Sequence, residues 1–344
     1  MRSAMSTKNI NTHIDNVANV TIVSRDRWLA TAQVCPYATY FHTPYWYELI
    51  APNQKHTALE VTFSDGASAV IPLVESKRLG GLFTSLYSSP GGTYGGWISA
   101  SALNKKHVNF LLDILNTKKN LTLRVNPFDK LLSSLLTQSI PLPPKITLIN
   151  DFTCTLDLTK SIDKLRGEIS RGHKNAINFA KRNGVTVKRA EKYDEWIDYY
   201  GLYLDSVKRW QMKGMKTRRV YPLALFKRLY DNCTGNETLW LAMKDGKPVA
   251  GALFFYWGAH AVGWHGAALA RHFHLKPNNL LHWEIIQDAV RRGCKIYDFN
   301  PSGGYSRVES FKKHFGARHL SSPILQTKTP VRSLISSLRA LYAR

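Results

Sequence analysis

The stretch PNNLLHWEIIQDAVRRGCKIYDFNPSGG, residues 277–304, decides the fold class of this chain. Apolar residues recur at spacings of three and four over residues 277–292, which predicts a helix, and Gly293 supplies a typical helix stop. Residues 295–299 then form a short apolar strand that leads into a glycine-rich loop. This alternation is typical of an α/β domain, in which ligands bind at the carboxyl ends of strands. We therefore expect functional chemistry near Asp298.

A strand, an Asp-Gly turn and a longer strand occur twice along the chain. The first copy covers residues 59–63 and 69–74 around Asp65-Gly66, and the second covers residues 239–243 and 249–257 around Asp245-Gly246. An Asp-Gly pair accepts the positive φ of a tight hairpin turn. The repeated order indicates an internal duplication.

The length and composition predict two globular domains and an acidic partner. A chain of 344 residues exceeds the usual size of a single core, and prolines 141, 143 and 144 interrupt regular structure just before residue 150. The formal net charge of +23 attracts phosphate-bearing or other polyanionic molecules. The candidates are tRNA, coenzyme A, a nucleotide- or lipid-linked precursor, and an anionic membrane.

Three segments outside the strongest motifs carry expectations of their own. Residues 161–183 are expected to form one long helix with Arg171 and Lys174 on its basic face. Residues 1–19 are polar and are expected to be flexible. Residues 330–344 are expected to form a basic amphipathic helix, which packs on the protein itself or lies on an anionic membrane.

Ordered motifs in the second half resemble the Fem peptidyltransferases and related GNAT-like acyltransferases of cell-envelope synthesis. They are RGEISRGHKNAINFAKRNGVTV at residues 166–187, YYGLYLDSVKRW at residues 199–210, and residues 263–317, which contain Tyr-Asp-Phe and Phe-Lys-x-x-Phe-Gly. The resemblance implies an α/β fold of two tandem GNAT-like domains (the acyl-CoA N-acyltransferase fold) with mixed central sheets. The first domain would cover residues 20–150 and about 317–335, and the second would cover residues 151–316.

The same resemblance implies an N-acyltransferase that moves an acyl or aminoacyl group onto an amine of a cell-envelope precursor. The acceptor is a peptidoglycan peptide or an amino sugar of a surface polysaccharide, whose amine attacks the acyl donor directly, and it would be acidic or lipid-linked. The donor is aminoacyl-tRNA or acyl-CoA, with no tightly bound cofactor. Residues 271–278, RHFHLKPN, lack the glycines with which GNAT enzymes hold the coenzyme A pyrophosphate, and Fem enzymes share that loss.

The resemblance also implies roles for individual residues. It puts Lys312 close to the reacting carbonyl, as an oxyanion or phosphate contact. It puts Arg209 where related enzymes hold the phosphates of the acceptor, a role that suits a guanidinium. Asp298 either takes a proton from the amine or caps a loop, and both readings stay open. His265, Glu309 and His314 are further candidates for the base.

Five residues complete the expected substrate-binding set: Arg171, Lys174, Tyr94, His265 and Tyr297. Tyr94 belongs to the glycine-rich loop 88–96, which either lets backbone amides approach a ligand or is a plain tight connection. Tyr297 belongs to the Tyr-Asp-Phe motif. The four cysteines are far apart and show no metal-binding spacing, so no metal is expected.

The sequence also gives expectations for the cellular location of the protein and for an alternative functional class. The sequence lacks a signal-peptide core and any run of about 18 apolar residues, so we expect a cytoplasmic protein, with peripheral contact at the inner membrane face as an open alternative. The alternative class is a non-catalytic basic module that binds RNA or a membrane surface. That class explains the charge but not the order of the motifs. The oligomeric state is not determined by the sequence.

Overall fold

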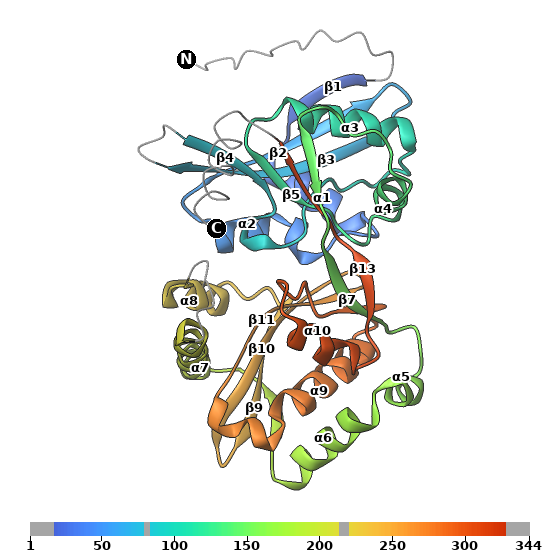
Figure 1. Cartoon of the computed structure of the whole chain (residues 1–344). Coiled ribbons are helices and arrows are strands. Elements are labelled where there is room, and N and C mark those ends of the chain that lie inside the picture. The colour runs from blue at the N-terminus through green and yellow to red at the C-terminus, as the bar shows by residue number, and fades with distance from the viewer. Residues whose placement is uncertain (1–16, 79–82, 213–219, 328–344) are drawn as a thin grey trace, which may run out of the picture.

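The computed structural model describes residues 17–78, 83–212 and 220–327, which form two mixed α/β halves (Figure 1). Each half contains one seven-stranded sheet. The strand order is β1-β2-β3-β4-β5-β14-β6 in the first sheet and β13-β7-β12-β11-β10-β9-β8 in the second. The fold class predicted from the sequence is confirmed.

The first half begins with β1 and carries its helices on both faces of the sheet (Figure 1). Its elements are β1 (Val17–Ile22), α1 (Arg25–Val34), η1 (Tyr40–His42), α2 (Pro44–Ile50), β2 (Lys55–Phe63), β3 (Ser68–Arg78), β4 (Phe83–Ser88), η3 (Pro90–Gly92), α3 (Lys105–Thr117), β5 (Leu121–Arg124), α4 (Lys130–Thr137), β6 (Ile146–Ile149) and β14 (Ile324–Thr327).

The second half contains the stretch from which the sequence analysis started. Its elements are β7 (Phe152–Asp157), α5 (Ile162–Glu168), α6 (Arg171–Arg182), β8 (Thr186–Arg189), α7 (Tyr193–Met212), α8 (Leu223–Asp231), β9 (Glu237–Lys244), β10 (Lys247–Trp257), β11 (His260–Ala268), η4 (Ala270–Leu275), α9 (Pro277–Arg291), β12 (Ile296–Asp298), α10 (Ser306–Lys313) and β13 (Arg318–Ser321).

The two predicted hairpins are present, as β2–β3 and β9–β10. Gly66 has φ +85°, and Asp245 and Gly246 have φ +49° and +74°, so both turns use the left-handed region that the Asp-Gly pairs were expected to supply. The predicted helix 277–292 and the strand 295–299 are likewise confirmed as α9 and β12. Local sequence therefore determines these elements.

The expected single helix over residues 161–183 is wrong, because it is two helices. Ile169 and Ser170 are extended, and the Ser170 hydroxyl accepts a hydrogen bond from the His173 N–H and so caps α6. Residues 17–19, expected to be flexible, pair with β2 as part of β1. The expected helix over residues 330–344 lies outside the described residues.

Strands β7 and β13 lie side by side where the two halves meet, antiparallel to each other (Figure 1). β13 still belongs to the second sheet, so the chain re-enters the first sheet only at β14, not at about residue 317. There β14 pairs with both β5 and β6. Its insertion ties the two halves together through the backbone.

A buried aromatic cluster is shared by both halves. Tyr40 and Trp46 from the first half pack on Phe255 of β10, with ring centroids 4.8 and 5.2 Å apart. On the other face of the second sheet, Phe254 and Tyr256 point to a separate core under α6 and α9. Side chains of β10 point alternately to the two faces of the sheet. Those on one face contact the first half, and those on the other face contact the helices of the second half.

Candidate functional site

A cavity of about 450 Å³ opens in the second half, next to the shared aromatic cluster. Its walls come from the end of α7, from β10 and β11, from the start of α9, from the loop after β12, and from α10. The β10–β11 register shifts so that Leu253 faces His265 while Phe254 faces Gly263, which leaves Trp264 as a bulge residue. Bulges commonly redirect side chains at functional sites, and Trp264 here lines the cavity.

The cavity is cationic and aromatic. Its charged lining residues are Arg209, Arg307 and Lys312, and among the described residues no aspartate or glutamate lines it. Six aromatic rings join them: Trp210, Phe254, Trp264, Phe273, Phe299 and Phe311. Such walls attract an anionic ligand and also bury apolar surface.

Lys312, predicted to lie near the reacting carbonyl, lines the cavity and is only 5% exposed. Its ammonium donates a hydrogen bond to the carbonyl oxygen of Asn300. Burial lowers the pKa of Lys312, while the nearby Cys154 and Asp298 act in the opposite direction. A cation held with one protein acceptor keeps N–H groups for a ligand.

Asp298 is fully buried and does not line the cavity. Its carboxylate accepts hydrogen bonds from Thr153 Oγ1 at 2.5 Å, from the Asn300 N–H at 2.8 Å and from the Tyr94 hydroxyl at 2.6 Å. Burial raises the pKa of Asp298, and the hydrogen bonds from Thr153 and Tyr94 oppose that rise. A carboxylate enclosed in this way does not fit the proton-accepting role considered for it.

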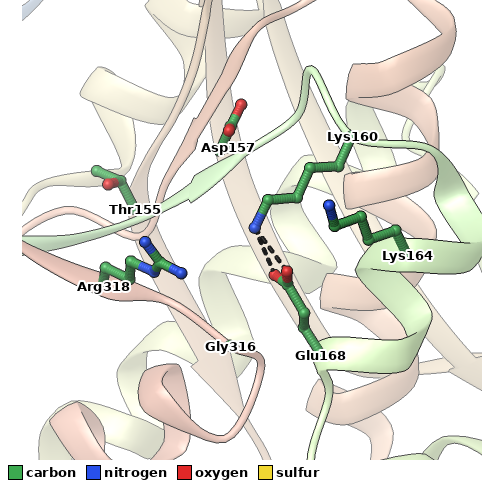
Figure 2. Close-up of a pocket in the computed structure, with 7 residues that line it drawn as sticks. All are labelled: Thr155, Asp157, Lys160, Lys164, Glu168, Gly316 and Arg318. Atoms are coloured by element: carbon green, nitrogen blue, oxygen red, sulfur yellow. Dashed lines mark hydrogen bonds and ion pairs between the residues drawn. The ribbon is translucent and has the colours of Figure 1, made fainter.

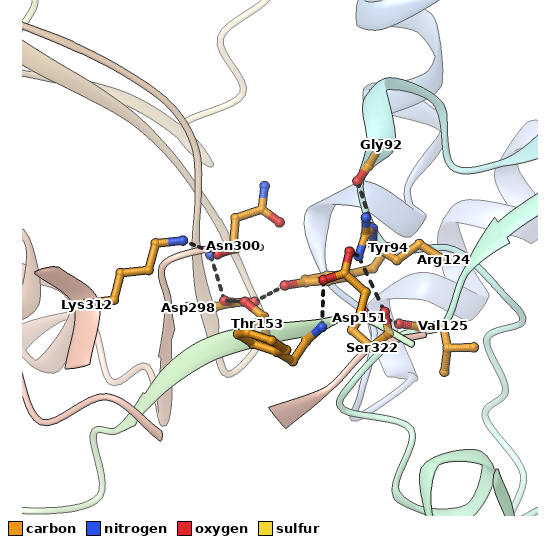
Figure 3. A network of polar contacts seen from close by, with 11 residues as sticks. Gly92, Tyr94, Arg124, Val125, Asp151, Thr153, Asp298, Asn300, Lys312 and Ser322 are labelled. Carbon is orange, nitrogen blue, oxygen red and sulfur yellow. Dashed lines mark hydrogen bonds and ion pairs between the residues drawn. The ribbon is translucent and has the colours of Figure 1, made fainter. Parts of the chain in front are cut away.

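Asn300 connects Asp298 to Lys312 (Figure 3). Its N–H is bonded to Asp298, its carbonyl accepts from Lys312, and its φ of +62° turns the loop sharply. Asp298 and Lys312 are thus brought together through a backbone group, not across an open cleft. Of the two roles considered for Asp298, this geometry fits a residue that caps the loop.

Tyr94, expected to bind substrate, is fully buried and links the halves through its bond to Asp298 (Figure 3). Its loop is closed on itself, since Ser88 Oγ accepts from the Gly96 N–H at 2.8 Å and the Gly95 N–H donates to the Arg124 carbonyl. A Cβ on Gly95 would lie 2.0 Å from the Ser88 carbonyl oxygen. Gly95 therefore serves close packing, and Tyr94 is a structural contact.

Two histidines line the cavity, each bonded through Nδ1 to a buried tyrosine. His265 on β11 is 2.6 Å from the Tyr199 hydroxyl, and His282 on α9 is 2.6 Å from the Tyr297 hydroxyl. Burial lowers the pKa of His265 to about 4. Burial, with Lys312 and His173, lowers the pKa of His282 to about 3. Both rings are therefore neutral near pH 7, and Tyr297 lies behind His282.

Arg209 lines the cavity from α7 and is held in place. Its guanidinium donates to the carbonyl of Ala268 at 3.1 Å and to Ser206 Oγ at 3.2 Å, and it stacks over the Phe273 ring at 5.0 Å. An arginine held at a cavity wall is pre-organised for an anionic group. This position fits the phosphate-binding role expected of it.

The other predicted residues lie outside the cavity. Arg171 and Lys174 are on α6 and line neither described hollow, and the Lys174 ammonium donates to the Gly167 carbonyl. Glu309 is bound by Lys313 at 2.6 Å, and His314 ends α10. The structure therefore does not bring Arg171, Lys174, Glu309 or His314 into the cavity.

Sequence reasoning missed several cavity residues, among them His282 and Arg307. His282 stands at an otherwise apolar position of the helix PNNLLHWEII, and that polar residue in an apolar run was the available signal. Arg307 follows the glycine loop by a few residues and carried no signal beyond its charge.

The start of α9 offers few free backbone N–H groups that could bind a pyrophosphate. Pro277 at its first turn has no N–H, and the N–H groups of Lys276 and Asn279 are bonded to the carbonyls of Phe273 and Lys276. The Phe273 ring lines the cavity in front of this helix end. Coenzyme A binding in GNAT enzymes depends on free amides there, so these residues do not fit that cofactor well.

A second hollow of about 390 Å³ lies between α5, β7 and the segment Gly316–Arg318 (Figure 2). Charges of both signs line it, and Lys160 is bonded to Glu168 at 2.6 Å. None of the residues expected to act in catalysis or binding lies there. The larger, uniformly cationic cavity is therefore the candidate site.

Two further findings concern the described residues only. Over residues 17–78, 83–212 and 220–327, no group of three or more His, Cys, Asp or Glu side chains is arranged to hold a metal ion. Within these same ranges, no helix is both long enough and apolar enough to cross a bilayer.

Comparisons with known proteins agree with this architecture. A family model described as an acetyltransferase (GNAT) domain matches residues 164–313, a little under half of the chain. The comparison with curated proteins found no match.

Three solved structures are similar over nearly the whole chain. FemX has a TM-score of 0.68 at 15% identity, over 92% of this chain and 100% of that chain. The C-terminal domain of a lysylphosphatidylglycerol synthetase from Agrobacterium fabrum has a TM-score of 0.54 at 11% identity, over 92% and 96%. A tandem GNAT protein from the clavulanic acid biosynthesis pathway has a TM-score of 0.52 at 9% identity, over 90% and 98%. The expected tandem GNAT-like fold, and the resemblance to Fem-type proteins, are thereby confirmed at the level of the fold.

Proposed function

We propose that this tandem GNAT-fold protein is an N-acyltransferase that transfers an acyl or aminoacyl group to an amine of a cell-envelope precursor. The observation that carries the proposal is the cationic cavity, in which Lys312 and Arg209 stand among aromatic walls, with no carboxylate from the described part of the chain beside them. The structural neighbours include FemX and the domain of a lysylphosphatidylglycerol synthetase, which supports acyl or aminoacyl transfer in cell-envelope synthesis. An acidic or lipid-linked precursor fits the charge of the cavity.

The residues suggest a direct attack of the amine on the carbonyl carbon. Negative charge then develops on the carbonyl oxygen, and the Lys312 ammonium is held where it can stabilise that charge. Arg209 holds a phosphate of the acceptor or the donor. No carboxylate among the described residues lines the cavity, and burial lowers the pKa of both lining histidines, so the amine is expected to arrive uncharged or to pass its proton to the leaving group or to water.

We favour an ester carried on RNA, that is aminoacyl-tRNA, over a coenzyme A thioester as the donor. The start of α9 offers a poor cradle for pyrophosphate, as Pro277 lacks an N–H and two neighbouring amides are bonded. The net charge of +23 also favours a long polyanion. Arg171 and Lys174 on the outer face of α6 are then candidates for contacts with the RNA backbone.

The test measures transfer and binding with both donors. Purified protein is given charged bulk tRNA or acetyl-CoA, with an amine-bearing nucleotide-linked peptidoglycan precursor or an amino-sugar precursor, and the acylated product is measured by mass spectrometry. We expect saturable binding of charged tRNA that persists at physiological salt, and transfer that is lost in Lys312→Met. Transfer from acetyl-CoA alone would overturn the choice of donor. Binding of RNA with no transfer to either acceptor would overturn the proposed function and support the non-catalytic module.

A further inference from the structure

His282 and Lys312 present two different kinds of donor to one cavity. Lys312 stands on α10 and His282 on α9, and both line the cavity beside Phe311. The ammonium of Lys312 is close enough to the His282 ring to disfavour its protonation. The pair therefore offers one charged and one neutral group to the same ligand.

The tautomer of His282 follows from its partner. The only hydrogen-bond partner of the Tyr297 hydroxyl among the described residues is His282 Nδ1, at 2.6 Å. A fully buried hydroxyl that donates to nothing would leave its proton unsatisfied, so the tyrosine donates to Nδ1. The ring proton of the neutral imidazole is then on Nε2.

Nε2 is the ring nitrogen of His282 that stays available to a ligand in the cavity. The ring lines the cavity, and Nε2 has no hydrogen-bond partner in the described part of the chain. His173 Nε2 is also without a partner, but it is fully inaccessible to solvent, whereas His282 Nε2 is not among the inaccessible unpartnered atoms. The rings of Phe299 and Phe311, with centroids 5.2 and 5.5 Å away, hold the imidazole in this orientation. A donor so held loses little conformational freedom when a ligand binds.

We propose that His282 donates a hydrogen bond from Nε2–H to the acyl oxygen of the donor, beside Lys312, and that Tyr297 is the positioning residue that holds the ring in this tautomer. This inference rests on the proposed acyl transfer. The amine nitrogen forms the new C–N bond, the carbonyl electron pair moves onto oxygen, and the oxyanion then expels the leaving oxygen or sulfur. The proton lost by the amine ends on the leaving group, and His282 keeps its own proton throughout.

A neutral donor differs from a general base in its response to pH. The titratable groups that face His282 are Lys312 on α10, His173 on α6 and Tyr297 on β12. The ammonium and the second imidazole disfavour the imidazolium form, and so does burial. We therefore expect the ring to stay neutral between about pH 5 and 8, with no effect of its own on the pH profile of kcat.

The first arm of the test reads the tautomer directly and does not depend on any activity. Protein labelled with ¹⁵N-histidine is studied by long-range proton–nitrogen correlation spectra from pH 5 to 8, and the signal lost in His282→Gln assigns the residue. We expect a neutral ring with its proton on Nε2 at every pH. In Tyr297→Phe we expect a mixture of both tautomers. A proton on Nδ1 in the wild type, or titration to imidazolium in this range, would overturn the inference.

The second arm compares variants in the transfer reaction. His282→Ala should lower kcat by about 10²–10³ with little change in KM, as for loss of one oxyanion donor. His282→Gln, whose amide N–H can replace the donor, should retain clearly more activity than His282→Ala. Equal losses in the two variants would argue for a base. The exposed His319→Gln serves as the control and should match the wild type.

The two arms separate the failure of this inference from the failure of the proposed function. If the wild type transfers no acyl group from either donor, the proposed function fails while the tautomer is still decided by the spectra. If transfer occurs but His282→Ala is as active as the wild type, the role of His282 fails alone. Should His282→Gln not fold, Tyr297→Phe still reports on the tautomer.

Discussion

Lys312 is the residue on which the chemistry depends most directly. The charge is nearly buried and is bonded to one backbone carbonyl, that of Asn300. Lys312→Met should lower kcat by about 10²–10³, because it removes the cation from the place where the oxyanion develops. Its unfolding midpoint should stay near that of the wild type, since Met removes both the hydrogen bond and the desolvation cost of the buried charge. Single-turnover transfer and thermal unfolding measure the two effects.

The neighbouring Lys313 provides the matched control for Lys312. It is exposed, and its ammonium forms an i,i+4 ion pair with Glu309 at 2.6 Å. Lys313→Met should change kcat by no more than about twofold, because exposed pairs of this kind contribute little. Equal loss of transfer in both variants would show that general charge, and not the position of Lys312, matters.

At the scale of the element, α7 carries Ser206 and Arg209 to the cavity, and Glu195 lies in its first turn. Glu195 accepts hydrogen bonds from the N–H groups of Glu191 and Lys192 and pairs with the Lys188 ammonium. The ammonium of Lys188 is the main cause that lowers the pKa of Glu195 to about 2, from an ordinary value of 4.5. Glu195 therefore caps the helix in its charged form.

This capping gives a pH-dependent prediction. A carboxylate whose pKa is lowered on folding stabilises the protein above its unfolded pKa, and that stabilisation is lost as the pH falls toward the folded value. Glu195→Gln should thus be less stable than the wild type by about 0.5–1 kcal/mol at pH 7, allowing for its solvent screening, and the gap should shrink between about pH 5 and 3. Urea unfolding across this range measures it. Glu191→Gln is the control, and a gap that is constant with pH would contradict the capping role.

At the scale of the whole molecule, Tyr94 joins the first half to the loop that holds Lys312. Tyr94→Phe removes the hydroxyl that donates to the buried Asp298 carboxylate. We expect a loss of about 1–3 kcal/mol in the free energy of unfolding, as a buried acceptor is left unpaired. We also expect a lower kcat, because Asp298 orients Asn300 and Asn300 orients Lys312. Tyr305→Phe on the surface is the control, and it should change neither quantity.

The shared aromatic cluster predicts that the two halves unfold together. Trp46 of the first half packs on Phe255 and on the cavity residue Trp264, at centroid distances of 5.2 and 5.1 Å. Strand β14 also returns to the first sheet after the second is complete. Calorimetry should therefore give one transition with equal calorimetric and van't Hoff enthalpies. Two resolved transitions would contradict this coupling.

Local pattern by itself identified several regular elements of this protein, whereas the tandem architecture followed from the resemblance of its ordered motifs to a known family. The spacing of apolar residues identified α9 and β12, and the Asp-Gly pairs identified both hairpins, because these features depend on residues close together in sequence. The order of motifs also led to Lys312 and Arg209, which line the cavity. The break between α5 and α6 was missed, because the capping by Ser170 competes with an unbroken apolar period.

Only the tertiary structure decided which polar groups meet. Tyr94 and Asp298 are 204 positions apart in sequence, so no local signal linked them, and both were expected in the site instead of behind it. His282 was not singled out from the sequence, and only the fold brings its ring to Tyr297 and to the cavity. Secondary structure follows from short-range sterics and periodicity, whereas the protonation state and direction of a site residue depend on distant groups that only packing brings into contact.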